Sequence, residues 1–490
     1  MGAARHSITS LRRSRALVTG AVLMMLSACA AYHGKPLPTG GNLARVSPAG
    51  IAPLDMNRVA TLAVLNNPDL NSARAAFGVA RAQAFAAGLL PDPHFNLTGD
   101  HPGDNVHPGD PRYPEYNEYG LELDVDLLSL LAHPAVKAST RFDYQQAQLN
   151  LLWQEWQTVA QARTLYVAQS IASQRSTFLA SAQRVYALAA QRSQRAQLAR
   201  NVTLEQSSAD LAVLQNVNSL LGDAERSLLA AQQGLRSLIG VGSDVTLPLQ
   251  PLAPPEIPSR AAVQSAVAQL PERRPDLRAL QAGYRAQEAR VRVAVLSQFP
   301  DVVVGFTKSR DNSDVHALGG LVNLTLPLFN RGRGELATQS ATRAQLRADY
   351  QARLDQAVGA VWQLWREMRQ LQGQLDTLQQ QLPRLQSSVD AAERAYQAAE
   401  FPAASYLTLV GSYLAAKELR EGLMQSLWND SIALATVLGT QVQPQLPSPQ
   451  MRPMDPRTPS PTQPSSTAAS RSAALQPVLA HTPPAAAGGS

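Results

Sequence analysis

The chain has 490 residues, a formal net charge of +6 and one cysteine. This length exceeds a single ordinary hydrophobic core, and an aromatic content of 5% suits long helices better than a compact globule. One cysteine excludes an intramolecular disulfide. The arginines are spread along polar helix faces without interleaved aromatic residues, which argues against a nucleic-acid-binding surface.

Residues 1–28 have the pattern of an export signal. Arg12, Arg13 and Arg15 precede an apolar run over 16–26, and small residues and then Cys29 follow it. The run is too short for a membrane-spanning helix, which needs about 20 residues. We therefore expect residues 1–28 to be a lipoprotein signal peptide and Cys29 to be the lipid attachment point. A plain signal peptide with an incidental cysteine is the alternative.

Next along the chain, a long helix is expected where helix breakers are missing. Neither Gly nor Pro occurs between Pro134 and Gly222, and apolar residues recur there at three- and four-residue spacing. A helix from about Val136 to Arg200 would be roughly 100 Å long. The expected reversal is Asn201, Val202 and Thr203, where Asn201 tolerates a left-handed backbone and Thr203 caps the returning helix.

The chain also repeats itself. The stretch Asn67-Pro68-Asp69-Leu70 opens a helix, and Arg274-Pro275-Asp276-Leu277 does so again. Each of these helices ends at a proline, is followed by strand-like sequence and a long helical section, and closes on Leu238-Ile239-Gly240 or Val437-Leu438-Gly439. We interpret this as a duplicated domain. The predicted segments are a signal peptide (1–28), a lipidated linker (29–54), a first repeat (55–240), an inter-repeat linker (241–273), a second repeat (274–440) and a disordered tail rich in Pro, Ser and Ala (441–490).

Four short strands are expected, two in each repeat. In the clearest one, over 119–127, apolar residues alternate with Gly120, Glu122, Asp124 and Asp126. Similar alternation occurs over 302–307 and 322–326, and more weakly over 94–98. Such segments are typical of transmembrane β-strands with lipid on one face and water on the other, although a half-buried soluble sheet looks similar. On the membrane interpretation, Glu122, Asp124 and Asp126 face the lumen and favour cations.

Four strands cannot close a conducting barrel, and lipid does not tolerate an open sheet edge. The barrel must therefore be shared between subunits. Three copies would supply twelve strands, and the long helices would extend the barrel into the periplasm. The predicted fold class is mainly α with a small membrane β part: duplicated long helical hairpins plus four strands per subunit, in a trimeric α/β barrel tunnel.

Several motifs together resemble the TolC-like outer-membrane efflux factors. In the first repeat they are the stretches 66–70 and 88–93. In the second repeat they are the stretches 274–277, 299–301 and 326–333 (Leu-Pro-Leu-Phe-Asn-Arg-Gly-Arg). Around the second hairpin tip they are Pro383, Ala395-Tyr396 and Ser405-Tyr406-Leu407. The resemblance covers roughly residues 55–440. It implies a homotrimer in the outer membrane that serves as the passive exit duct of a tripartite efflux system, with a periplasmic adaptor and an inner-membrane pump as partners. The resemblance points most to the branch that serves heavy-metal and related cation pumps, so metal cations are one expected cargo. Because a tunnel wall makes few specific contacts, we expect the pump to select the cargo.

The hairpin tips depart from the family pattern. Members often carry Gly at the tips, whereas this chain has Ala199-Arg200-Asn201 and Ala399-Glu400-Phe401-Pro402. Some members place acidic gate residues after the second tip, where this chain has Leu407 and Val410. A hydrophobic gate at Leu407 and Val410 is one interpretation, and ordinary coiled-coil packing is the other. The tip residues Asn201, Val202, Thr203, Leu407 and Val410 are also candidates for the adaptor contact.

We find no catalytic motif in the sequence, so neither an enzymatic activity nor a cofactor is predicted. His101 and His107 each begin a His-Pro-Gly-Asp sequence. Imidazole and carboxylate groups can bind a divalent cation, but Pro-Gly-Asp is ordinary turn chemistry, which we favour. Two other classes remain as alternatives: a lipid-anchored periplasmic adaptor or scaffold, and a secreted enzyme with a helical appendage.

Overall fold

The structure is a computed structural model, and it describes residues 34–41, 53–100, 117–311, 313–398 and 400–439. The chain divides into two units, Met1–Leu43 and Ala44–Ser490. In the first unit, residues 34–41 are exposed and form neither helix nor strand. The predictions for Cys29, His101, His107 and the tail 441–490 concern residues outside the described part.

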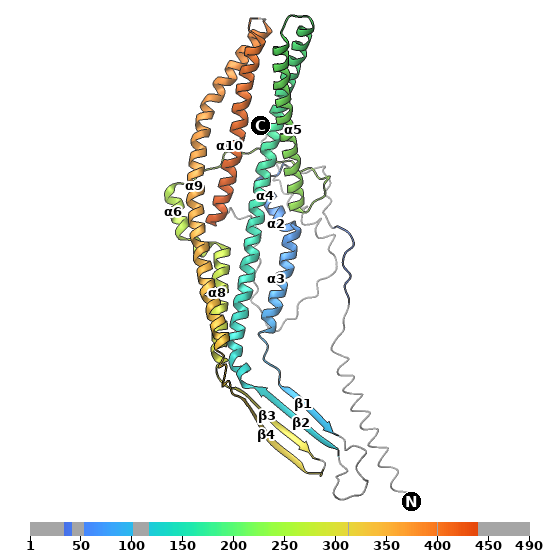
Figure 1. Cartoon of the computed structure of the whole chain (residues 1–490), viewed down its shortest axis with the longest axis vertical. Helices are drawn as coiled ribbons and strands as arrows, with labels where there is room; N and C mark the ends of the chain where they lie inside the picture. Colours follow the sequence, from blue (N-terminus) through green and yellow to red (C-terminus); the bar gives the residue numbers. More distant parts are fainter. Residues whose placement is uncertain (1–33, 42–52, 101–116, 312, 399, 440–490) are drawn as a thin grey trace, which may run out of the picture. The chain divides into compact units, whose positions relative to one another are not determined.

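The second unit contains long helices and one small sheet (Figure 1). In chain order the elements are α2 (Met56–Asn66), α3 (Pro68–Ala86), β1 (His94–Asp100), β2 (Glu118–Asp126), α4 (Leu127–Leu198), α5 (Leu204–Ile239), α6 (Arg260–Ala268), α7 (Leu270–Arg273), α8 (Pro275–Leu296), β3 (Asp301–Arg310), β4 (His316–Thr325), α9 (Arg333–Gln397) and α10 (Ala403–Leu438). The series helix, two strands, long helix and returning helix thus occurs twice, as predicted.

Helix α4 confirms the long helix, although its predicted start was wrong. It has 72 residues, about 110 Å at 1.5 Å per residue, and begins at Leu127 rather than near Val136. Asp126 explains the earlier start, because its side chain accepts a hydrogen bond from the Ser129 backbone N–H at 3.1 Å. Pro134 lies in the second turn, where the sequence had suggested a breaker.

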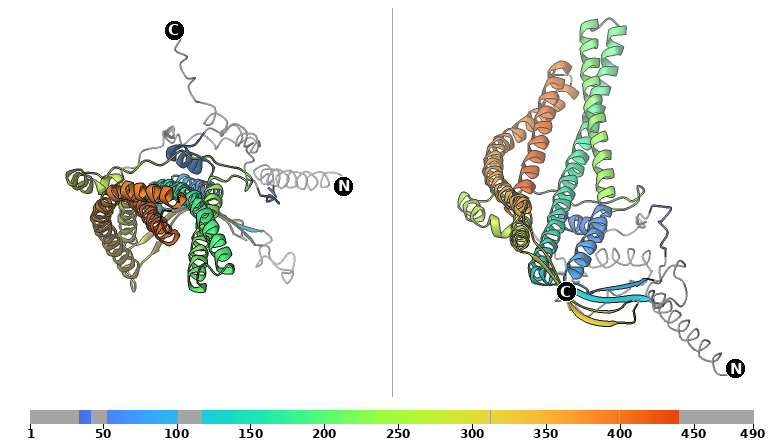
Figure 2. Two further views of the ribbon diagram at one scale, coloured as in Figure 1. Left: turned by 90° about the horizontal axis from the view of Figure 1, so that it is seen from above. Right: turned by 60° about the horizontal axis from the view of Figure 1, so that its bottom comes forward.

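The helices form four columns side by side. Helix α4 packs against α3 and α5 on one side and against α8 and α10 on the other, while α9 packs against α8 and α10. Helices α3 and α5 therefore share one column, and α8 and α10 share another, with α4 and α9 as the continuous columns (Figures 1 and 2). The sheet has the strand order β1-β2-β3-β4. Each strand joins the column of the same rank, so the order of the sheet is that of the helices.

Equivalent contacts join the shared columns in the two repeats. Asn67 caps α3 by accepting from the Leu70 N–H at 2.8 Å, and its amide donates to the Leu238 carbonyl at the end of α5 at 3.0 Å. Arg274, at the matching position of the second repeat, donates to the Val437 carbonyl at the end of α10 at 3.5 Å. Different residues therefore make the same joint between a starting and an ending helix.

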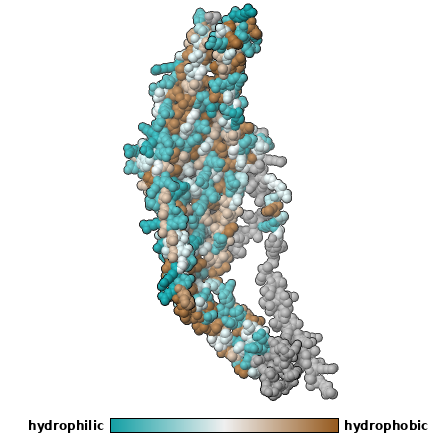
Figure 3. Space-filling view, viewed as in Figure 1, coloured by the Kyte–Doolittle hydropathy of each residue, from teal (hydrophilic) through white to brown (hydrophobic). Residues whose placement is uncertain are grey.

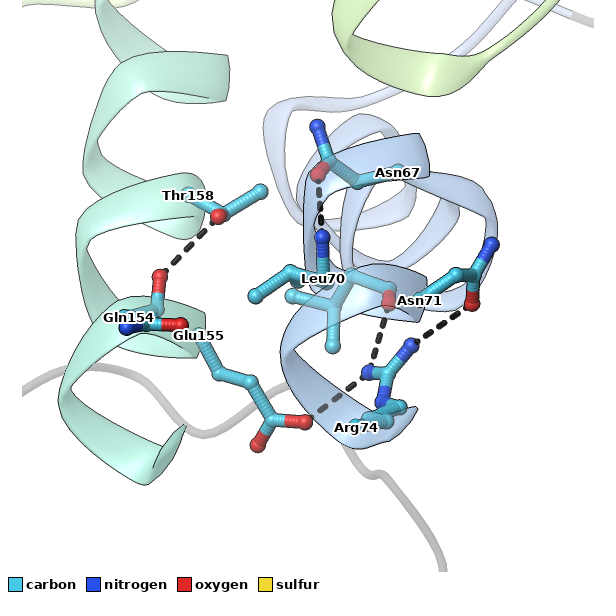
Figure 4. Close-up of polar contacts among 8 residues, drawn as sticks. Asn67, Leu70, Asn71, Arg74, Gln154, Glu155 and Thr158 are labelled. Carbon is cyan, nitrogen blue, oxygen red and sulfur yellow. Dashed lines mark hydrogen bonds and ion pairs between the residues drawn. The ribbon is translucent and has the colours of Figure 1, made fainter. Parts of the chain in front are cut away.

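Ion pairs also link the starting helix at each joint to the long helix of the same repeat. In the first repeat, Arg74 reaches from α3 to Glu155 on α4 at 2.8 Å (Figure 4). In the second, Asp276 accepts from Arg274 at 2.6 Å and from Arg353 on α9 at 2.9 Å. Burial would raise the pKa of Asp276, but hydrogen bonds and charge from both arginines hold it below its ordinary value.

The glycines that end the two repeats generate a prediction. Gly240 follows α5 with φ of +71°, and a Cβ there would lie 2.8 Å from the Asn66 carbonyl oxygen. Gly240→Ala should therefore lower the free energy of unfolding by about 1–2 kcal/mol or more. Thermal unfolding followed by circular dichroism measures the change.

Gly222, inside α5, is the matched control, because an added methyl would approach only the mobile end of Arg226. Gly222→Ala should stabilise by up to about 1 kcal/mol. Equal effects of the two substitutions would contradict the role assigned to Gly240.

Candidate functional site

The sheet presents one apolar and one mainly polar face. In the register, Leu123 lies between Phe95 and Phe306, and Val304 between Val125 and Val322. Most large side chains on this apolar face are exposed, and Figure 3 shows apolar side chains over the sheet and at its junction with the helices. The apolar face contains Phe95, Leu97, Leu121, Leu123, Val125, Val302, Val304, Phe306, Leu318, Val322 and Leu324.

The predicted lumen residues lie together on the opposite face. Glu122, Asp124 and Asp126 alternate along β2 with the apolar residues, as expected for a strand. Asp124 is 7% exposed and contacts His94 of β1, with 3.3 Å between Oδ2 and Nδ1. The sequence alone did not predict this contact, which results from the pairing of His94 with Asp124 in the sheet.

A glycine allows close pairing behind these carboxylates. Gly305 is opposite Asp124, and a Cβ on it would lie 2.6 Å from the Leu123 carbonyl oxygen and 2.9 Å from the Asp124 Cβ. Most neighbours on this face are small or polar, including Gly120, Gly319 and Asn323. The face can therefore line a water-filled space, whereas the apolar face cannot.

The first hairpin tip has the expected reversal but not the expected left-handed residue. Arg200, with φ of 60°, takes that conformation instead of Asn201. The backbone N–H of Asn201 donates to the Ala196 carbonyl at 2.8 Å, and α4 ends at Leu198, two residues before the predicted end at Arg200. Thr203 caps α5, accepting from the Gln206 N–H at 3.2 Å. Val202 lies between them, partly buried.

A tyrosine cluster joins the two hairpins near their tips, and its member Tyr186 was not among the residues that the sequence singled out. Tyr186 of α4 donates to the Leu407 carbonyl of α10 at 3.0 Å, and Tyr396 stacks on Tyr406 with 5.2 Å between ring centres. Val410 is 8% exposed in the same apolar group. We call this group the tip cluster; its buried members are Leu179, Ala182, Tyr186, Val217, Ala224, Val389, Ala392, Tyr406, Val410 and Leu414. A gate or adaptor contact at Leu407 and Val410 stays a prediction.

Charged residues separate the tip cluster from a second group, the middle cluster, which includes Val167 and Ile171 of α4 and Met424 and Leu427 of α10. There, two nitrogen atoms of Arg175 hold the Glu418 carboxylate at 2.6–3.3 Å.

A second carboxyl in this layer, that of Glu421, is 3% exposed and accepts from Arg420 at 3.0 Å. Burial raises its pKa, against the charges of Arg420 and Lys417, which lower it.

The described residues contain no group of three or more His, Cys, Asp or Glu side chains placed to hold a metal ion. None of the described helices combines the length and apolar character needed to cross a bilayer.

Comparisons with known proteins agree with this architecture. Residues 266–440 match the family model described as outer membrane efflux protein. Among solved structures, the chain is similar to CusC, with 18% identity and a TM-score of 0.65 over 84% of this chain and 99% of that one. It is similar to the CmeC outer membrane channel of Campylobacter jejuni (16% identity, TM-score 0.66, 78% and 85% covered) and to MtrE of Neisseria gonorrhoeae (16%, 0.63, 84% and 97%). No curated protein sequence matches the chain.

The fold is therefore that of the TolC-like outer-membrane channels. The residues that match the family model, 266–440, contain all of α7, α8, β3, β4, α9 and α10.

The hydrogen bond between the hairpins generates a prediction. Burial and the neighbouring Tyr406 raise the pKa of Tyr186 to about 12, so its hydroxyl remains a donor at neutral pH. Tyr186→Phe should lower the free energy of unfolding by about 1 kcal/mol and raise the rate of backbone hydrogen exchange around Leu407 roughly fivefold. Tyr413→Phe, which keeps its ring against Lys417, is the control. Unchanged exchange in Tyr186→Phe would contradict the assigned role.

Glu418 and Glu421 should respond to substitution in opposite directions. Glu418→Gln breaks a partly buried pair and should lower stability by roughly 1–3 kcal/mol at pH 8. Because folding raises the pKa of Glu421, this carboxyl stabilises the fold below its ordinary pKa of 4.5, and that contribution is lost as the pH rises through the raised value. Relative to the unsubstituted protein, Glu421→Gln should therefore raise the free energy of unfolding more at pH 8 than at pH 4. Thermal unfolding at both pH values measures this, and equal shifts would refute it.

Proposed function

We propose that the chain is the outer-membrane channel-tunnel of a tripartite efflux system, the passive exit duct for substrates that an inner-membrane pump and a periplasmic adaptor deliver. One observation carries the proposal: the four-stranded sheet has an exposed apolar face, an acidic face, and two outer strands that each pair on one side only among the described residues.

The two open edges favour assembly of identical copies. Strands β1 and β4 present unpaired backbone groups, which hydrocarbon penalises strongly. Joining β4 of one copy to β1 of the next keeps the antiparallel alternation, because β1 and β4 run in opposite directions. Three copies close twelve strands, with the apolar face toward lipid and the face of Glu122, Asp124 and Asp126 toward the lumen.

The helical columns then continue the same ring. Since the columns have the order of the strands, joining β4 to β1 also brings α9 of one copy beside α3 of the next. The helices would form a tube that extends into the periplasm, with the tips at residues 199–203 and 398–402 facing the adaptor and pump. Cys29 would carry the lipid anchor. Metal cations are one candidate cargo, consistent with the acidic lumen face.

A lipid-anchored periplasmic scaffold is the second candidate. It would share the long hairpins, but it gives no reason for a sheet whose apolar face is left exposed. The two proposals differ in the expected state of the purified protein. A channel should migrate as a heat-sensitive trimer from the outer-membrane fraction and produce conductance steps in planar bilayers. A purified protein that is a single subunit and gives no conductance would contradict the channel proposal.

The acidic face generates a prediction about ion selectivity. The double substitution Glu122→Gln with Asp124→Asn should lower the preference for potassium over chloride, because it removes two carboxylates per copy from the lumen wall. The reversal potential under a potassium chloride gradient measures this preference.

The control pair is Asp244→Asn with Glu256→Gln, which removes the same charge from exposed positions between the repeats. Retention of the trimer band would show that the lumen variant still folds. An equal reversal potential in both variants would contradict a lumen position for the acidic face.

A further inference from the structure

Figure 1 shows the ends of the strands that lie farthest from the helices. At these ends, the two faces of the sheet carry side chains of opposite charge. On the apolar face, Tyr119 pairs with Arg310, Arg310 with His316, and Leu121 with Lys308. On the other face, Asp100 pairs with Glu118 at the same level. Cationic groups therefore stand on the apolar side and carboxylates on the polar side.

The basic residues form a defined group at the end of the apolar band. We call Tyr119, Lys308, Arg310 and His316 the rim group. Arg310 Nη2 lies 2.5 Å from Asp314 Oδ1, and His316 Nε2 lies 3.5 Å from the same oxygen. Asp314 thus draws Arg310 and His316 together, while Lys308 is exposed. Among the described residues of this group, the Asp314 carboxylate is accompanied by two permanently charged cations and an imidazole, while Asp311 of the same turn accepts from the backbone N–H groups of Ser313 and Val315. The group therefore attracts anions.

We propose that the rim group binds the phosphate groups of a phosphorylated lipid in the outer leaflet of the membrane. This inference rests on the proposed function, which turns the apolar face toward hydrocarbon and the rim away from the periplasmic helices. Within two residues along β3, the apolar face passes from Phe306, 73% exposed, to Lys308. A molecule with acyl chains and an anionic headgroup matches that succession, whereas a free anion would use only its end.

Side-chain chemistry favours the same occupant. Arginine holds phosphate through several N–H donors, and lysine reaches past apolar surface to place its ammonium at headgroup level. Tyr119 is an aromatic residue with a polar hydroxyl, the type enriched at membrane–water interfaces. The carboxylates of Asp100 and Glu118 do not interfere, because they lie on the opposite face.

The test uses the full-length, detergent-purified trimer. Native mass spectrometry would titrate it with a bisphosphorylated glucosamine-based lipid and with the same lipid lacking phosphates. Lys308→Gln with Arg310→Gln should weaken binding of the phosphorylated lipid about 30-fold, from the usual contribution of each cation near an anionic membrane surface. Binding of the dephosphorylated lipid should not change.

Two controls separate the rim group from general charge effects. Asp100→Asn with Glu118→Gln changes charge at the same level on the opposite face and should not weaken binding. Arg366→Gln with Arg369→Gln removes two exposed cations from α9, more than 30 residues beyond its start, and should leave binding unchanged.

The outcomes distinguish this inference from the proposed function. A conducting trimer that binds both lipids equally overturns the rim inference alone. Competition by millimolar inorganic phosphate as effective as that by the lipid overturns the assignment to a lipid. Failure to form a trimer or to conduct overturns the proposed function, and the rim inference with it.

Discussion

Backbone hydrogen bonding at the sheet edges is the constraint on which the rest of this structure depends. A strand in hydrocarbon must pair all its peptide groups within protein, and here the outer strands β1 and β4 each have one described partner. Since four strands cannot curve into a closed cylinder with a lumen, the remaining partners come from other copies in the proposed channel. The four helical columns have the same order, so they are constrained by the same closure.

The joints between shared columns follow from this geometry. A wall of four columns per copy continues along the full length of α4 only if α5 takes over where α3 begins, and α10 where α8 begins. Asn67 and Arg274 make these joints, each donating to a carbonyl two residues before a left-handed glycine. The two repeats thus share the position of this contact but use different residues for it. The side-chain amide of Asn67 makes the first joint, and the guanidinium of Arg274, held by Asp276, makes the second.

The sequence predicted those parts of the fold that local patterns determine. Alternation along β2 and the breaker-free stretch after Pro134 are local signals, and so are the two Pro-Asp-Leu helix starts. The lateral order of the columns was outside the reach of these signals because it depends on contacts between residues far apart in sequence. The same limit applied at the tip: a left-handed residue was expected at Asn201, but the length of α4 puts Arg200 there.

The candidate site divides in the same way. Strand parity alone was enough to place Glu122, Asp124 and Asp126 on one face, whereas the contact of His94 with Asp124 required the register between two strands. The bond from Tyr186 to Leu407 and the pair Arg175–Glu418 required the register between α4 and α10. A single sequence does not contain that register, because each helix offers an apolar stripe that fits its partner at more than one offset.

The charged layer between the tip and middle clusters fixes this offset. Apolar stripes of neighbouring long helices tolerate sliding by about two turns, since the next set of apolar residues replaces the first. The ion pair does not tolerate sliding, because sliding would leave the partly buried Arg175 and Glu418 without each other beside the apolar clusters, at a cost of roughly 1–3 kcal/mol. The layer occurs at the corresponding place on both helices: Arg175 lies between Ile171 and Leu179, and Glu418 between Leu414 and Met424. It therefore sets the relative position of the two hairpin tips, which the proposed adaptor would contact together.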